Sequence, residues 1–183
     1  MMIKNILSIT LAFSLAASLY GAEEKQTDSN EFEVSQSSEM PPAPKPPVPP
    51  LVRDDKTEIV YDPTTKLMWQ DDVEAKTTRK KFYDEGLFSN SYPAQDYCKN
   101  LKLGGYSDWR LPDIKEFSSI TDTDKSNLAI KIGFKNLIGK MYWSSSSKAG
   151  YKNLNWQIEF ESGHTDTANK GSSHFIRCVR ESK

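Results

Sequence analysis

The residues that most often carry enzyme chemistry are few in this sequence, and their spacing does not suit catalysis. His164 and His174 lie on separate segments, with no further histidine or cysteine at the spacing of metal ligands. The serine run 144–147 lacks the Gly-x-Ser-x-Gly turn that exposes a catalytic serine. A glycine-rich loop of the phosphate-binding kind is also missing. We therefore expect a protein without enzyme activity, cofactor or metal.

The two cysteines, Cys98 and Cys178, suit a disulfide better than catalysis. Redox enzymes usually carry a close Cys-x-x-Cys pair, which is absent here. Because the first residues of the chain have the pattern of an export signal, the simplest expectation is a bond between the two cysteines in an oxidising compartment. In the chain-entropy model, closing a loop of about 80 residues would stabilise the fold by ~4 kcal/mol.

Side chains with the chemistry of ligand binding occur together at Asp108-Trp109-Arg110. Tryptophan can stack on a sugar or a cation, and arginine can hold a sulfate or carboxylate with two parallel hydrogen bonds. The alternative is structural, with Trp109 in the core and Asp108 paired with Arg110. Arg177 and Arg180, on either side of the second cysteine, present the same choice. Arg177 points away from that cysteine on a strand, where it could be the buried partner of a carboxylate.

Residues 1–21 have the pattern of a signal peptide. Lys4 precedes an apolar run at 6–20, and small residues follow it, so we expect cleavage between Ser18 and Ala22. A membrane anchor would need ~20 apolar residues, and this run is shorter. The mature protein is therefore expected in the periplasm, or secreted to the cell surface, without a membrane span.

The balance of charges argues against one class of partner. The sequence has 24 lysines and arginines against 25 aspartates and glutamates, a formal net charge of −1. A near-neutral chain has no general electrostatic attraction to nucleic acid. We expect a protein or a glycan as the partner.

Residues 22–56 are expected to form an unstructured linker. The segment 23–39 is polar and shows no apolar period, and the segment 41–50 holds seven prolines. Such a run favours polyproline II, which extends by about 3.1 Å per residue. It is either a spacer or a docking strip for an aromatic groove on a partner.

Residues 57–183 have the length and apolar content of one domain. The runs 59–61 and 67–69 surround a turn signal and predict a hairpin. The segment 76–88 is locally basic and is expected to be a solvated loop.

Two short helices are predicted next. The first begins near residues 91–93, has an apolar face that includes Cys98, and is stopped by Gly104-Gly105. In the second, Asp113 and Glu116 have the spacing of a capping box. The pattern of the remaining residues predicts strands at 142–144, 155–160, 164–167 and 175–180.

Taken in order, these segments resemble the DUF1566 family, also called the Lcl C-terminal domain family. The resemblance covers about Val60 to Arg180. It implies an α+β domain of the C-type-lectin-like kind, a single domain with two short helices packed on small antiparallel sheets, preceded here by the disordered proline-rich arm. The pieces that carry the resemblance are 62–69, 94–101 with Cys98, 104–112 with Glu116, 142–145 with Trp143, 156–160 with Trp156, and 176–180.

The resemblance implies an exported binding module. Some relatives are adhesins for sulfated glycans, but this sequence has neither a collagen-like repeat nor the motifs of calcium-dependent lectins. We favour a non-enzymatic module that recognises a protein or glycan in the cell envelope. A second hypothesis is a scaffold component of an envelope machine, such as a flagellar motor or secretion apparatus. A formylglycine-generating enzyme, which shares the implied fold, would need two reactive cysteines and is disfavoured.

Overall fold

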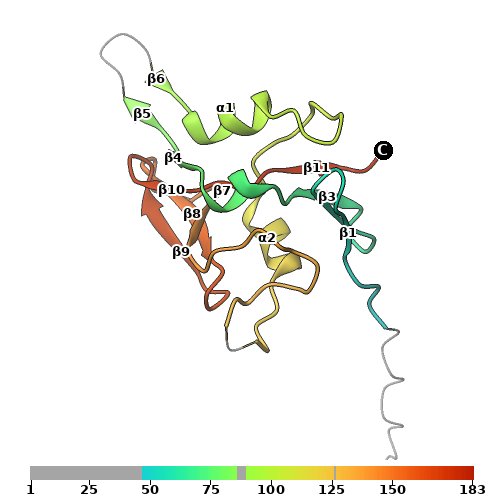
Figure 1. The fold of residues 1–183 in the computed structure, drawn as a ribbon. Helices are drawn as coiled ribbons and strands as arrows, with labels where there is room; N and C mark the ends of the chain where they lie inside the picture. Colours follow the sequence, from blue (N-terminus) through green and yellow to red (C-terminus); the bar gives the residue numbers. More distant parts are fainter. Residues whose placement is uncertain (1–46, 86–89, 126) are drawn as a thin grey trace, which may run out of the picture. The chain divides into compact units, whose positions relative to one another are not determined.

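The computed structural model describes residues 47–85, 90–125 and 127–183 (Figure 1). The expected signal peptide and most of the expected linker, including residues 41–46 of the proline-rich run, lie outside the described residues. Within the described ranges, no helix is long and apolar enough to cross a membrane.

The first sheet has four antiparallel strands and contains the predicted hairpin. Its strand order is β1-β2-β3-β11, and Val60 pairs with Trp69 in the hairpin. The sheet begins inside the segment expected to be linker, because Arg53 in β1 pairs with Val60. The linker prediction of 22–56 was therefore too long at its C-terminal end. The strands are β1 (Val52–Asp54), β2 (Ile59–Asp62), β3 (Leu67–Gln70) and β11 (Val179–Glu181).

The second sheet has five strands in the order β4-β10-β7-β8-β9. Its pairs are antiparallel except β10 with β7, which is parallel, so the expectation of purely antiparallel sheets was wrong for this pair. The strands are β4 (Arg79–Lys81), β7 (Met141–Ser147), β8 (Leu154–Glu159), β9 (Thr165–Asn169) and β10 (Ser173–Phe175).

Two sequence predictions about these strands were wrong. The predicted strand 175–180 is two strands, because the chain leaves the five-stranded sheet after Phe175 and enters the four-stranded sheet at Val179. The basic segment 76–88 contains an edge strand where only a loop was expected. Short elements around it are η1 (Val73–Lys76), β5 (Asp84–Glu85) and β6 (Asn90–Ser91).

Both predicted helices are present. α1 (Pro93–Asn100) begins with a proline, which fits the first turn because its missing N–H needs no partner there. α2 (Ile114–Ile120) begins with the full capping box between Asp113 and Glu116.

The two glycines do not end α1, which stops before Leu101. They form the turn between Leu103 and Tyr106, with φ of +60° at Gly104 and +81° at Gly105. A Cβ at Gly104 would overlap Ile59 of β2, so this turn packs directly on the four-stranded sheet.

The described residues enclose two apolar clusters. One lies around α2, where Phe117 contacts Trp69 of the four-stranded sheet and Phe160. The other surrounds the two cysteines and includes Trp109 and Trp143. An α+β fold of two helices and two small sheets is thereby confirmed.

Candidate functional site

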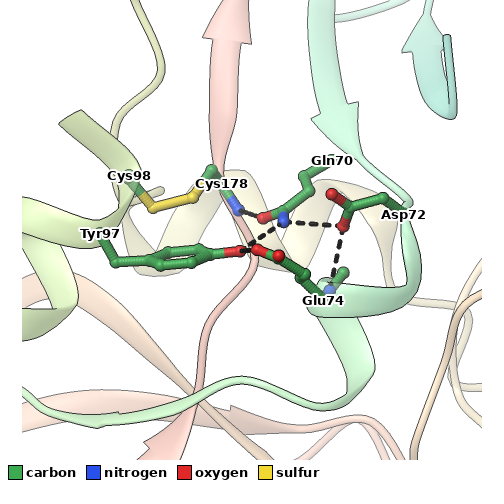
Figure 2. Close-up of a disulfide and its surroundings, with 7 residues drawn as sticks. Gln70, Asp72, Glu74, Tyr97, Cys98 and Cys178 are labelled. Atoms are coloured by element: carbon green, nitrogen blue, oxygen red, sulfur yellow. Dashed lines mark hydrogen bonds between the residues drawn. A yellow bond between two sulfur atoms is a disulfide. The ribbon is translucent and has the colours of Figure 1, made fainter. Parts of the chain in front are cut away.

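The predicted disulfide joins Cys98 of α1 to Cys178, just before β11 (Figure 2). Gln70 fixes the second cysteine, because its side-chain oxygen accepts a 3.0 Å hydrogen bond from the Cys178 backbone N–H. The Gln70 amide also donates to the Tyr97 hydroxyl at 2.9 Å, which in turn donates to Glu74 at 2.8 Å. Burial raises the pKa of Tyr97, so the hydroxyl stays protonated as a donor. This chain of contacts ties α1 to the end of β3, and both thiols are consumed.

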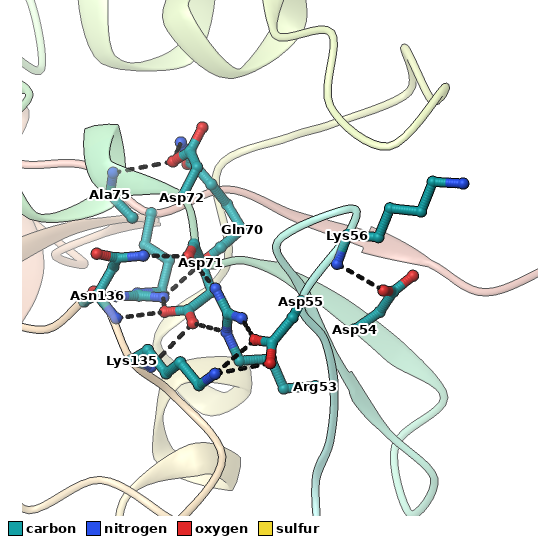
Figure 3. Close-up of polar contacts among 11 residues, drawn as sticks. Arg53, Asp54, Asp55, Lys56, Gln70, Asp71, Asp72, Ala75, Lys135 and Asn136 are labelled. Carbon is teal, nitrogen blue, oxygen red and sulfur yellow. Dashed lines mark hydrogen bonds and ion pairs between the residues drawn. The ribbon is translucent and has the colours of Figure 1, made fainter.

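Arg177 lies between β10 and β11 and is the buried partner of a carboxylate, as the sequence analysis suggested. Its guanidinium lies 3.3 Å from Asp71, and neither side chain is exposed. Asp71 also accepts hydrogen bonds from Arg53 and from the backbone N–H groups of Lys135 and Asn136 (Figure 3). These contacts satisfy the carboxylate within the protein and leave no open position for a ligand.

Asp108 does not pair with Arg110, so this part of the structural alternative in the sequence analysis was wrong. Its carboxylate accepts hydrogen bonds from Arg180, with a shortest distance of 2.7 Å. The hydrogen bond to Arg180 lowers the pKa of Asp108 to about 2. Arg180 also lies 3.8 Å above the ring of Tyr106 and is almost fully buried. The pair holds the glycine turn against β11.

Arg110 pairs instead with Glu116 through two hydrogen bonds, of 2.6 and 2.8 Å. Glu116 also accepts the Asp113 backbone N–H in the capping box. The arginine therefore anchors the start of α2. Asp108 and Arg110, adjacent to one tryptophan, lie in two different surface hollows of about 350 and 410 Å³.

The tryptophans of the candidate set differ in accessibility. Trp109 and Trp143 are buried in the cluster around the disulfide, as the structural alternative required for Trp109. Trp156 on β8 is half-buried. Most of the candidate residues therefore stabilise the fold, and the structure does not bring them together as one open site.

The ionisable side chains do not converge on a metal position. Within residues 47–85, 90–125 and 127–183, no group of three or more histidines, cysteines, aspartates or glutamates could hold an ion. His174 packs edge-on against Trp143 at 4.6 Å, and burial lowers its pKa.

A groove of about 560 Å³ lies where β5 and β6 meet the turn between β9 and β10. Tyr83 and Tyr92 form its aromatic wall, with ring centroids 5.2 Å apart. Backbone hydrogen bonds fix this wall to the sheet, because the Tyr83 N–H donates to Lys170 and the Lys170 N–H donates to Asn153, each at 2.9 Å. The polar side chains of the lining are those of Lys81, Asp84, Glu85, Lys152, Asn153, Asn169 and Lys170.

Sequence reasoning missed this groove. Its residues come from three parts of the chain, at 81–85 with Tyr92, at 152–153 and at 169–171, and none forms a recognisable motif. The basic character of the segment 76–88 was the only signal available. This basic segment does contribute to the groove, but the sequence analysis interpreted it as a solvated loop.

The fold defines a class of small α+β domains in which a disulfide joins the first helix to the segment just before the last strand. Within that class, the chain belongs to the Lcl C-terminal domain family, whose model matches residues 58–180. The resemblance seen in the sequence is thereby confirmed. No curated protein matches the chain.

Proposed function

We propose that this protein is an exported, non-enzymatic module that binds a protein or a glycan in the cell envelope or at the cell surface. The groove at Tyr83 and Tyr92 is the observation that carries the proposal. It places two aromatic rings beside charged and amide side chains, a combination that suits a polar ligand such as a sugar or a peptide.

The state of the reactive side chains supports a binding function over catalysis. Cys98 and Cys178 are joined to each other, so the pair of reactive thiols that a formylglycine-generating enzyme needs is absent. The Asp71 carboxylate, which is completely buried, is engaged by Arg53 and Arg177 and by backbone donors. Titration of the folded protein with a thiol reagent checks the first point, since two reacting thiols would contradict it.

A C-type-lectin-like arrangement is part of the same proposal. It is supported by two short helices, two small sheets and a disulfide from the first helix to the segment just before the C-terminal strand. Export is supported by the disulfide, which persists in oxidising compartments, and by the signal-peptide pattern of residues 1–21.

The test is to immobilise the mature protein and present it with envelope extracts and, separately, with a glycan array. Tyr92→Ala should strongly reduce the specific signal, because Tyr92 supplies the exposed ring of the groove. Tyr106→Ala is the matched control, since Tyr106 has a similar exposure but lies outside the groove. Equal loss in both variants, or loss in neither, contradicts the proposal.

The two arms of this experiment also separate the alternatives. Recovery of one stoichiometric protein complex that requires Tyr92 would favour a scaffold in an envelope machine, such as a flagellar motor or secretion apparatus. Binding to glycans without a protein partner would favour a lectin. Cell fractionation would then place the protein in the periplasm or on the surface.

A further inference from the structure

The aromatic wall of the groove presents one well-supported ring to solvent. Tyr92 is 44% exposed, although Phe82 lies edge-on to it at 6.3 Å and Tyr83 lies beside it at 5.2 Å. Such a ring loses little freedom when a ligand binds, because its neighbours already restrict it. The electron-rich face of a tyrosine attracts the polarised C–H groups on one side of a pyranose ring.

Two asparagines provide hydrogen bonds beside this wall. Asn153 and Asn169 are exposed and lie at the facing ends of β8 and β9, where Leu154 pairs with Asn169. The Asn169 side-chain oxygen accepts the Gly171 N–H at 2.9 Å, which fixes the amide and turns its N–H₂ group away from that contact. Amides of this kind both donate to and accept from sugar hydroxyls.

The charges of the groove leave one lysine without an internal partner. Lys81 pairs with Asp84 at 2.8 Å, and the Lys170 ammonium donates to the Lys152 carbonyl at 2.7 Å. In the part of the chain that the structure describes, no carboxylate pairs with the exposed Lys152 ammonium. Glu85, which also lines the groove, would repel a second negative charge. The groove therefore suits one isolated anion and not a dense series of them.

We infer that the groove binds a saccharide chain with widely spaced carboxylates, an inference that rests on the proposed binding function of this groove. One pyranose stacks on Tyr92, its hydroxyls bond to Asn153 and Asn169, and its carboxylate faces Lys152. A densely sulfated chain fits less well, because Asp84 and Glu85 offset two of the three lysines that line the groove.

The test is a titration of the mature protein with a hyaluronan hexasaccharide, which has one carboxylate per disaccharide, followed by calorimetry. The other probes are the uncharged chitohexaose, a heparin hexasaccharide and a peptide rich in aspartate and glutamate. We expect the hyaluronan probe to bind best and the salt dependence to be shallow, because a single charge pair is formed.

Substitutions locate the binding and separate its parts. Tyr92→Ala should weaken hyaluronan binding about tenfold, from loss of the stacked ring. Lys152→Ala should weaken it about threefold at low salt, and chitohexaose binding should not change. The controls Tyr106→Ala and Lys183→Ala lie in a different hollow and should bind as the unmodified protein does.

Several outcomes overturn the inference. If chitohexaose binds as tightly as the hyaluronan hexasaccharide, the carboxylate has no role in binding. If the heparin hexasaccharide binds more tightly than hyaluronan, the groove does not prefer widely spaced charges. Binding of none of the saccharides, or binding insensitive to Tyr92→Ala, excludes the groove as a saccharide site. Binding of the acidic peptide alone, with the same dependence on Tyr92, overturns the saccharide and leaves the proposed binding function standing.

Discussion

The Asp71 carboxylate lies 3.3 Å from the Arg177 guanidinium inside the domain, and both side chains are completely buried. Arg53 reaches the same carboxylate from β1, and the loop at Lys135 and Asn136 contributes backbone donors. One acid thus joins the start of the domain, the end of β3, a long loop and the segment before β11. Asp71 therefore links elements that lie far apart in the sequence.

Arg177→Met should be strongly destabilising. The variant removes one of two arginines that contact the Asp71 carboxylate, and it takes the donor away from the carbonyl groups of Gln70 and Asn136. Typical losses for breaking a buried ion pair are ~3–5 kcal/mol. Urea denaturation followed by circular dichroism measures the free energy of unfolding. Lys81→Met is the matched control, because its pair with Asp84 is exposed and should contribute less than about 1 kcal/mol. Similar losses in the free energy of unfolding in both variants would show that the buried pair stabilises the domain no more than the exposed pair does.

Reduction of the Cys98–Cys178 disulfide should also lower the stability. The cysteines are 80 residues apart, so the bond restricts a long loop in the unfolded chain. The expected loss is ~4 kcal/mol in the chain-entropy model. The urea midpoint with and without reductant measures this loss of stability. The double variant Cys98→Ala, Cys178→Ala should have the midpoint of the reduced protein, and adding reductant should not change that midpoint. An unchanged midpoint after complete reduction would contradict this prediction.

The pair of Asp108 and Arg180 should make stability depend on pH in an acidic window. The hydrogen bond from Arg180 lowers the pKa of Asp108 from its ordinary 3.8 to about 2 in the folded protein. Because the unfolded chain binds this proton more readily, the contribution of the pair is complete above about pH 4 and is lost as the pH falls towards about 2.

Asp108→Asn isolates this effect from the other carboxylates. The variant should be less stable than the unmodified protein at neutral pH, and the two urea midpoints should converge between about pH 4 and about pH 2. A difference that stays constant across this window would show that the carboxylate charge is not what stabilises the pair.

Gly104 and Gly105 offer a comparison within one turn. Both have positive φ, so alanine at either position should cost ~1–2 kcal/mol from the left-handed backbone. At Gly104 the added methyl group would also collide with Ile59 and contact Thr57, whereas nothing lies near it at Gly105. Overpacking should therefore make Gly104→Ala the worse variant by a further ~1–3 kcal/mol. Thermal unfolding of the two variants tests this order, and equal midpoints would remove the packing role of Gly104.

Features that depend on neighbouring residues were predicted well. The hairpin at 59–70 and the capping box of Asp113 and Glu116 are both present. The disulfide was also predicted, because two cysteines in a chain expected to be exported leave one pairing. Strand boundaries were predicted less well. The residues 175–180 have the apolar pattern of one strand but contribute to two strands in different sheets.

The sequence by itself determined the hairpin, the two helices, the pairing of the cysteines and the family, because turn, cap and helix signals act over a few residues. Only the tertiary structure decided that Asp108 pairs with Arg180 and Arg110 with Glu116. It also assembled the groove of Tyr83 and Tyr92 from three distant segments. The reason is physical: which charges and rings come within a few ångströms of each other depends on how the sheets pack, and a linear pattern does not encode that distance.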